Sequence, residues 1–211
     1  MDMQMSKLHA GIITILNLRR NTYIIGIDEA GRGPLAGPVV VAGVWGPREF
    51  FRRCQLRKMR DSKKLSVKQR EKWFSYLTSH PKIEWAAARV STGVIDRINI
   101  AQAANLGAVR ACTRLCTKLS LVQAPLILLD GGLKLPMHIA HRAIIKGDEK
   151  IPAIAAASII AKVTRDRIML RLHKKYPEYR FDLHKGYGTK LHMEKMRQFG
   201  RCPKHRQSFA K

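Results

Sequence analysis

The sequence predicts an α/β fold, and three features of the chain support that prediction. Short apolar runs at 23–27, 126–129 and 143–145 are bounded by turn residues, as strands buried on both faces are. Apolar residues recur along 100–119 at the spacing of one helix face. A proline at position 152 stands where a helix tolerates one, at the start of a segment that is expected to be helical to about residue 175. At 211 residues the chain fits a single domain.

The first half of the chain is expected to hold three strands and one helix. Strands are predicted over 23–28 and 39–45, and the segment between them is expected to be a loop because it is rich in Gly and Pro. Residues 66–69 (Ser-Val-Lys-Gln) resemble a capping box, so a helix is expected to begin there and to end near residue 79. The third strand is expected over 83–90.

The second half is expected to alternate helices and strands. In order, we predict a helix over 100–119, a strand that ends at Asp130, a strand over 143–146 and a helix over 152–175. Small residues at 155–158 would let the last of these approach the sheet closely. The tail from Tyr176 holds His, Gly and aromatic residues, with one more helix expected near 189–199.

Charge is the strongest feature of the composition. The chain has 40 Lys and Arg against 15 Asp and Glu, a formal net charge of +25. Such an excess attracts polyanions through phosphate contacts and counterion release, so the expected partner is a nucleic acid. The sequence has no amphipathic helix with a large apolar face and no lipidation motif, so no membrane partner is expected.

The cysteines and the N-terminus bear on where the protein works. The four cysteines form no C-x-x-C pair, so we expect free thiols rather than a zinc site. Free thiols suit a reducing compartment, and a cytoplasmic location is expected. The apolar run at 11–16 is too short for a transmembrane helix and lacks the pattern of a signal peptide. Residues 1–22 are therefore expected to be an N-terminal extension.

Acidic residues follow the predicted strands at three places. Asp28 and Glu29 end the first run, Asp130 ends the second, and Asp148 follows the third. A single carboxylate after a strand is usually a cap or a loop ion pair, but three groups in a chain with few acids indicate a shared site. Carboxylates gathered at one edge of a sheet repel one another unless hard divalent cations neutralise them. The sequence therefore predicts a Mg²⁺ or Mn²⁺ site, in which two ions can activate a water and stabilise the leaving oxygen of a phosphodiester.

Three further segments are candidates for substrate contact. The Gly31-Arg32-Gly33 turn is a poor match to a dinucleotide fingerprint, since a strand rather than a helix follows it. It is either a plain turn or a loop whose amides approach a nucleic-acid backbone. The basic residues between 52 and 64, among them Lys63, are either a solvated face or phosphate contacts. Tyr187, flanked by Gly, is either surface packing or a ring that stacks on a base or sugar.

The motifs, taken in order, resemble those of one known family. Residues 23–38 resemble the opening motif of type 2 ribonuclease H (ribonuclease HII), and no single block is as specific as the series. The later blocks, in order, lie at 61–66, 129–131, 146–148, 154–167 and 184–189, and the series closes with His205-Arg206-x-Ser208-Phe209. The related type 3 enzymes carry an extra N-terminal domain, for which the first 22 residues are too few.

The resemblance implies a ribonuclease H-like fold, with a mixed five-stranded central sheet flanked by helices. The domain would span 23–211, with a helical C-terminal segment from about 176. It implies an endonuclease that hydrolyses the RNA strand of RNA–DNA hybrids and nicks 5′ of single ribonucleotides in duplex DNA by two-metal-ion catalysis. The products would carry 5′-phosphate and 3′-hydroxyl ends. We expect the protein to act as a monomer.

The resemblance also implies roles for individual residues. The metal-binding acids of the family match Asp28, Glu29, Asp130 and Asp148. The loop that senses the ribose 2′-hydroxyl matches Gly31, Arg32 and Gly33. The tyrosine that stacks on the sugar past the junction matches Tyr187, and Lys63 in the second block is expected to bind substrate.

Two other functions fit part of the sequence. A basic nucleic-acid-binding protein without catalysis would explain the charge, but it gives no reason for acids that repel phosphate. Another nuclease of the same broad fold, such as a junction resolvase, would explain the carboxylates but not the Gly loop and the tyrosine. Cleavage of a duplex that carries one ribonucleotide, in Mg²⁺ or Mn²⁺, separates the three.

Overall fold

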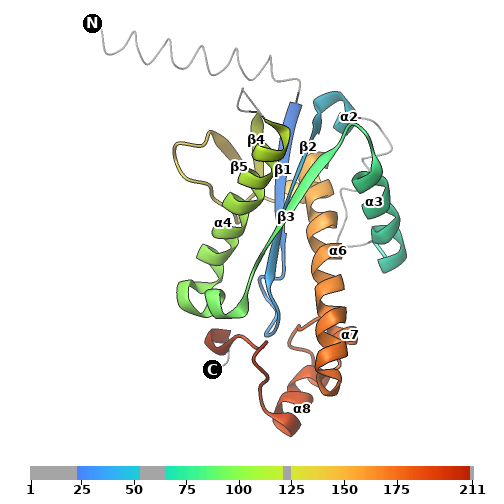
Figure 1. Ribbon diagram of the computed structural model, residues 1–211, viewed down its shortest axis with the longest axis vertical. Coiled ribbons are helices and arrows are strands. Elements are labelled where there is room, and N and C mark those ends of the chain that lie inside the picture. The colour runs from blue at the N-terminus through green and yellow to red at the C-terminus, as the bar shows by residue number, and fades with distance from the viewer. Residues whose placement is uncertain (1–22, 53–64, 121–124, 210–211) are drawn as a thin grey trace, which may run out of the picture.

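The computed structural model describes residues 23–52, 65–120 and 125–209, and its centre is a mixed sheet of five strands (Figure 1). The strands are β1 Tyr23–Ala30, β2 Val39–Pro47, β3 Glu84–Val90, β4 Leu126–Asp130 and β5 His141–Ile144. They lie in the order β3-β2-β1-β4-β5. β2 is antiparallel to both of its neighbours, whereas β4 is parallel to β1 and to β5. The predicted α/β fold with a mixed five-stranded sheet is confirmed.

Helices cover both faces of the sheet: α4, Thr92–Leu119, lies on one face and α6, Pro152–Lys175, on the other (Figure 1). Successive side chains of β1 point to opposite faces, so Ile25 and Ile27 pack on the α4 side and Ile24 on the α6 side. At Gly26 a Cβ would lie 2.2 Å from the carbonyl carbon of Ala153. The small residues at the start of α6 thus let the helix approach the backbone of β1.

The remaining helical elements are short except for α3. They are α2 Arg48–Arg52, α3 Val67–Ser79, α5 Gly147–Lys150, η2 Pro177–Tyr179, α7 Phe181–His184, α8 Lys190–Phe199 and η3 Gln207–Phe209. The predicted capping box is present at the start of α3, where the Ser66 amide donates to Gln69 and the Gln69 amide donates to the Ser66 hydroxyl. Within the described residues, no helix has the length and apolar content needed to cross a membrane.

The helix predicted over 100–119 is the second part of a longer element. α4 begins at Thr92 and bends at Asn99, whose φ of 63° and ψ of 167° are not helical. The Asn99 side chain accepts a hydrogen bond from the amide of Gln102 at 3.0 Å, so it caps the second part in the manner of a helix start. The prediction therefore placed the start of the second part correctly but missed the turns before it.

The strand predicted over 143–146 lies two residues earlier in the chain, at His141–Ile144, and the prediction that it is buried was wrong. β5 ends at Ile144, and Lys146 has a φ of 53°, which turns the chain into α5. The run is not covered on both faces, since Arg142 and Ala143 are exposed and Ile145 is 76 % exposed. β5 is an edge strand with β4 as its one neighbour in the sheet, so apolar residues there do not signal a buried strand. Asp148 consequently lies in a short helix rather than at a strand end.

The C-terminal part, from η2 onward, lies at the end of the sheet reached by the β1–β2 connection (Figure 1). It includes the predicted helix near 189–199, which is α8. The amide of Leu35 donates to the carbonyl of Gly186 at 2.8 Å, and the amide of Gly37 donates to that of Lys204 at 2.8 Å. The Gly/Pro loop predicted at 31–38 is thus held between two segments of the tail.

Candidate active site

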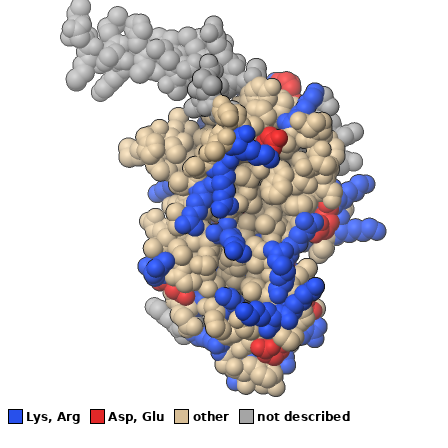
Figure 2. Space-filling view, in the orientation of Figure 1, with Lys and Arg blue, Asp and Glu red and all other residues tan. Residues whose placement is uncertain are grey.

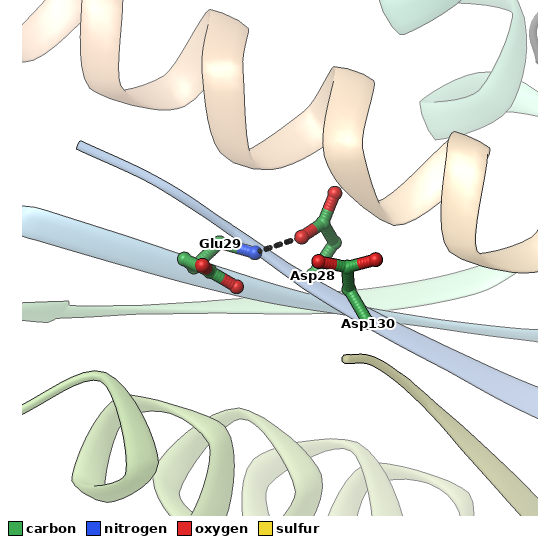
Figure 3. A group of neighbouring side chains, drawn as sticks. All are labelled: Asp28, Glu29 and Asp130. Atoms are coloured by element: carbon green, nitrogen blue, oxygen red, sulfur yellow. Dashed lines mark hydrogen bonds between the residues drawn. The ribbon is translucent and has the colours of Figure 1, made fainter. Parts of the chain in front are cut away.

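Three of the four predicted acids meet near the carboxyl ends of β1 and β4. β1 and β4 are adjacent and parallel, with Ile27 opposite Leu129, so Asp28 and Asp130, the next residue of each strand, lie side by side. Asp28, Glu29 and Asp130 each offer a carboxylate oxygen, and these atoms all lie within 4.8 Å of one another. Figure 3 shows the three side chains between the helices on the two faces of the sheet. The topology of the sheet, rather than any local motif, brings Asp130 to the other two.

The electrostatics of this group favour a bound cation. Asp28 is buried, and burial raises its pKa well above the usual value, with the charges of Glu29 and Asp130 raising it further. Burial also raises the pKa of Glu29, while Arg32 opposes that shift and Asp130 adds to it. The Glu29 Oε2 atom is buried and has no hydrogen-bond partner among the described residues. Three crowded carboxylates with an unpaired buried oxygen form a donor set that fits a hard divalent cation.

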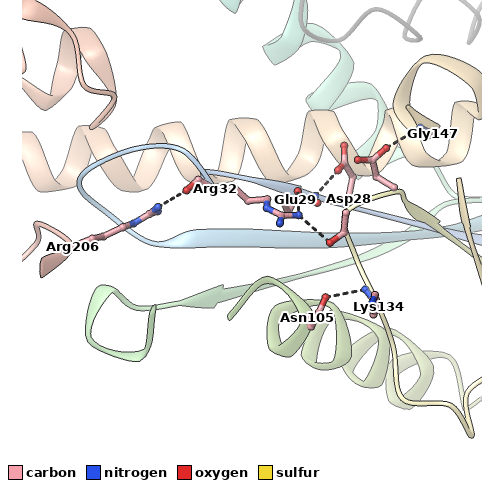
Figure 4. A network of polar contacts seen from close by, with 9 residues as sticks. Asp28, Glu29, Arg32, Asn105, Lys134, Gly147 and Arg206 are labelled. Carbon is pink, nitrogen blue, oxygen red and sulfur yellow. Dashed lines mark hydrogen bonds and ion pairs between the residues drawn. The ribbon is translucent and has the colours of Figure 1, made fainter. Parts of the chain in front are cut away.

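Asp148 lies near this group without being part of it. The amide of Gly147 donates to Asp130 Oδ1 at 2.8 Å, so the first turn of α5 is held against Asp130 (Figure 4). Asp148 is the next residue and is buried, with 4 % of its surface exposed. Its carboxylate is nevertheless outside the set of oxygens that lie within 4.8 Å of one another.

The Gly31–Gly33 turn lies directly after the acids. Gly31 has a φ of 99°, and a Cβ there would lie 2.1 Å from Arg165 Nε, so both backbone conformation and space require glycine. At Gly33 a Cβ would meet no atom within 4 Å, and the backbone there is open. The Arg32 guanidinium turns back, donating to the carbonyl of Gly132 at 2.9 Å and to Glu29 Oε1 at 3.4 Å (Figure 4). Arg32 is therefore paired with the acidic group rather than extended into solvent.

A pocket of about 230 Å³ joins the turn to Tyr187. Its walls come from β1, the turn, α3, α6 and the tail, and they are Glu29, Ala30, Gly31, Arg70, Ser158, Lys162 and Tyr187. The ring of Tyr187 is 41 % exposed, with Lys162 Nζ and Arg165 Cζ each 5.6 Å from its centroid. A partly exposed aromatic ring, a cation and a carboxylate in one pocket can bind a sugar or base beside a phosphate.

Positive charge is prominent on the surface of the molecule. Figure 2 shows Lys and Arg side chains spread over one face of the molecule with few acids between them. Part of this charge serves the fold, since Lys118 pairs with Glu84 and Arg114 donates to the carbonyl of Ala87. The predicted contact Lys63, and most of the basic cluster with it, lies outside the described residues.

Several residues of the site were not predicted to be functional individually, although two of them lie in the 154–167 block. Gly132 accommodates Arg32, because a Cβ there would lie 2.3 Å from Arg32 Nη1. Ser158 hydrogen-bonds to Asp28 from α6, although its small size was predicted to serve only helix–sheet packing. Lys162, the next turn along that helix, forms an ion pair with Asp166 at 2.9 Å. Ser158 and Lys162 lie four residues apart on one helix face, and this spacing was the available signal.

Comparison with known proteins gives a consistent result. The sequence profile described as Ribonuclease HII matches residues 25–211. Ribonuclease HII of Coxiella burnetii (strain Dugway 5J108-111) is 44 % identical over 189 residues, covering 90 % of this chain and 89 % of that protein. Ribonuclease HII of Bacillus mycoides (strain KBAB4) is 48 % identical over 190 residues, covering 90 % of this chain and 69 % of the relative. The crystal structure of ribonuclease H2 from Pyrococcus horikoshii OT3 superposes with a TM-score of 0.67 at 30 % identity, covering 88 % of this chain and 93 % of the other.

Proposed function

The chain belongs to the ribonuclease HII family and is a ribonuclease H, and from that premise we propose that it nicks duplex DNA on the 5′ side of a single ribonucleotide. The observation that carries this proposal is the arrangement of the pocket. Gly31 and Tyr187 line the same cavity as Glu29, whose carboxylate lies within 4.8 Å of those of Asp28 and Asp130. A group that recognises one sugar thus lies beside a group that can act on the adjoining phosphate.

We propose that Asp28, Glu29, Asp130 and Asp148 hold two divalent ions, Mg²⁺ or Mn²⁺. Oxygen donors without histidine favour these ions over zinc. When bound, such ions supply an activated water and charge stabilisation at the leaving oxygen, which would leave a 5′-phosphate and a 3′-hydroxyl. The raised pKa of Asp28 supports a cation at this place, because a buried carboxylate beside two others is costly to ionise alone.

The sugar would be recognised by two elements on the wall of the pocket. The open backbone at Gly33 suits hydrogen bonding to a ribose 2′-hydroxyl, which only a ribonucleotide presents. The exposed ring of Tyr187 suits stacking on the neighbouring sugar, and the nearby Lys162 suits contact with phosphate. A site that hydrogen-bonds a hydroxyl rejects the analogue that lacks it by roughly 10⁴- to 10⁵-fold, so plain DNA would not be cut.

Further parts of the proposal rest on composition and on family resemblance. We propose a catalytic domain over 23–211 with residues 1–22 as an extension, Lys63 as a substrate contact, and action as a monomer on RNA–DNA hybrids and ribonucleotide-containing DNA. The described cysteines Cys112, Cys116 and Cys202 are free thiols, as expected in a reducing compartment, and we propose that the protein works in the cytoplasm.

The test uses the full-length protein and three labelled duplexes that differ only in sugar: one ribonucleotide in DNA, a stretch of RNA opposite DNA, and DNA alone. With Mg²⁺ or Mn²⁺ we expect one nick, 5′ of the lone ribonucleotide, cleavage of the hybrid and no cleavage of DNA. A metal chelator should abolish both activities, and added Mg²⁺ or Mn²⁺ should restore them. Binding without cleavage in either metal would favour the binding protein, and cleavage of branched DNA alone would favour a resolvase.

A further inference from the structure

Two adjacent residues of the C-terminal tail, His205 and Arg206, connect to two segments that line the pocket. These are the Gly31–Gly33 turn and the segment that carries Tyr187. The side chains of His205 and Arg206 are both buried, with 2 % and 1 % of their surfaces exposed, so neither can touch a substrate. The segment that carries them pairs with the Gly/Pro loop, through a β-bridge between Ala36 and His205 and a 2.8 Å hydrogen bond from the Arg206 amide to the Leu35 carbonyl. Consecutive side chains of an extended segment point to opposite sides, which lets the two residues serve different elements.

Arg206 holds the turn that contains Gly31 and Gly33. Its guanidinium donates to three backbone carbonyls, those of Gly37 at 3.0 Å, Arg32 at 2.8 Å and Gly31 at 2.6 Å. Figure 4 shows the bond to Arg32. In a planar trans peptide the carbonyl of one residue and the amide of the next point in opposite directions. Fixing the carbonyls of Gly31 and Arg32 therefore turns the amides of Arg32 and Gly33 away from Arg206. Those amides are the donors that a ribose hydroxyl would meet.

His205 holds the segment that contains Tyr187, through a second histidine. The Cys202 amide donates to His205 Nδ1 at 3.0 Å, and the Cys202 carbonyl lies 3.2 Å from the same atom, so the tautomer of His205 follows from the contact of its Nε2 atom. His205 Nε2 lies 3.1 Å from His192 Nε2, and His192 Nδ1 lies 2.9 Å from the carbonyl of Tyr187. A carbonyl only accepts, so His192 carries its proton on Nδ1 and accepts from His205 on Nε2. The partners thus assign one neutral tautomer to each ring, and the relay runs from Cys202 to Tyr187.

The environment keeps this relay neutral and anchored. Burial lowers the pKa of His205 and lowers that of His192 to about 4, so both rings are uncharged near neutral pH. The tail is fixed to the start of α4, where the Ser208 amide and hydroxyl donate to Asp96 Oδ1 at 3.0 and 2.7 Å. The loop and the tyrosine segment also meet directly, through the Leu35 amide and the Gly186 carbonyl.

We propose that His205 and Arg206 are positioning residues that align Tyr187 with the amides of the Gly31–Gly33 turn, and thereby set the choice of the ribonucleotide junction. This inference rests on the proposed function, since it concerns the same pocket. It assigns a role to the His205-Arg206 motif, which neither the acids nor the substrate contacts require. Orientation of a bound group affects the rate of reaction more than its affinity, because phosphate contacts hold the duplex in either case.

Matched amide variants separate the two halves of the relay. Glutamine places an amide nitrogen near the His205 Nε2 position, so His205→Gln keeps a donor toward His192. Asparagine reaches only the Nδ1 position, so His205→Asn keeps a partner for Cys202 and loses the donor. For Arg206, lysine keeps the charge but cannot span three carbonyls. Arg201→Lys is the control, because Arg201 is exposed in the same segment.

We expect His205→Asn and Arg206→Lys to lower kcat on the lone-ribonucleotide duplex by about 10- to 100-fold, since small misplacements at a reacting centre cost this much. KM should change by less than about threefold, because the phosphate contacts are intact. His205→Gln and the Arg201→Lys control should stay within about threefold of wild type. Thermal unfolding monitored by circular dichroism shows which variants are folded, and the His205 pair carries the test if Arg206→Lys unfolds.

A double-mutant cycle then asks whether the relay acts through the tyrosine. In a Tyr187→Ala background, His205→Asn should lower the nicking rate by less than about twofold, because the side chain it positions is gone. The inference would be overturned if the rate losses of Tyr187→Ala and His205→Asn multiplied in the double variant. It would also be overturned by equal losses in folded His205→Gln and His205→Asn, or by a wild-type rate in folded Arg206→Lys. Failure of the wild type to nick at the ribonucleotide would instead refute the proposed function.

Discussion

The buried histidines predict a specific dependence of stability on pH, which can be measured without substrate or metal. His192 has no exposed surface, and burial, with the neighbouring His184 and His205 adding to it, lowers its pKa from 6.5 to about 4. In the unfolded chain the same ring would have its ordinary pKa near 6.5. Between these two values the unfolded state binds the proton and the folded state does not. The contribution of His192 to the free energy of unfolding is therefore fully present above about pH 6.5, and it is lost as the pH falls toward 4.

The size of the effect follows from the two pKa values. Each unit of pKa difference is worth 1.36 kcal/mol, so His192 alone should cost about 1.4 kcal/mol of stability by pH 5.5 and about 3 kcal/mol by pH 4. The pKa values of His184 and His205 are lowered in the same direction, again chiefly by burial, and add to the loss. Buried carboxyls such as Asp28 have raised pKa values and act in the opposite sense, so the wild-type curve alone would mix the two effects.

A variant isolates the contribution of His192. His192→Asn keeps a donor near the Nδ1 position for the Tyr187 carbonyl and removes the titrating ring, so the carboxyl contributions cancel between the two proteins. Urea unfolding followed by tryptophan fluorescence at several pH values gives both free energies. Their difference should shrink by about 3 kcal/mol between pH 7 and pH 4. The matched control is His138→Asn, at an exposed position, which should follow the wild type. A difference that stays constant with pH would refute the assignment of a buried neutral ring.

Three further predictions concern activity. Asp28→Asn and Asp130→Asn should each abolish cleavage and preserve binding in a gel-shift assay, because the amide removes a metal ligand and negative charge that faces phosphate; cleavage near the wild-type rate in Mg²⁺ would contradict the metal site. Tyr187→Ala should slow nicking at a lone ribonucleotide by roughly 5- to 150-fold, the equivalent of 1–3 kcal/mol of stacking, and an unchanged rate would exclude stacking. Gly132→Ala should displace the Arg32 guanidinium, whose Nη1 atom would lie 2.3 Å from the new Cβ, and should therefore lower the nicking rate. The free energy of unfolding in urea should stay within about 0.5 kcal/mol of wild type.

The sequence predicted best where the determinant is local. β1 and β4 could be located from apolar runs and the acids beside them, although β1 continues two residues past its predicted end, to Ala30. The parallel pairing of these strands then brings Asp28 and Asp130 together. The cap of α3 was predicted because Ser66 and Gln69 carry their own hydrogen-bonding partners at a fixed spacing. In each case the residues that define the feature lie within a few positions of one another.

Prediction failed where solvent exposure or a single backbone angle decided the outcome. The apolar residues of β5 resemble a buried strand, yet the strand lies at the edge of the sheet, and exposure at an edge depends on strand order rather than on composition. Lys146 then takes a φ of 53° and turns the chain into α5, which carries Asp148 away from the strand end. The residues around 92–98 join α4 because Asn99 absorbs the bend in its own backbone angle.

The contacts that hold the pocket together show a deeper limit of sequence reasoning. Arg206 binds carbonyls that lie 169 to 175 residues earlier in the chain, and every residue carries such a carbonyl, so no side-chain pattern marks those partners. His205 likewise reaches Tyr187 through that residue's backbone and not through its ring. Motifs can therefore identify the residues of a site, the His205-Arg206 pair among them, without identifying the backbone groups that this pair holds. A relative that kept the acids, the Gly turn and the tyrosine but replaced the His-Arg pair would still match the family by its motifs. Such a relative is expected to bind the same duplex but to cut the ribonucleotide junction less selectively.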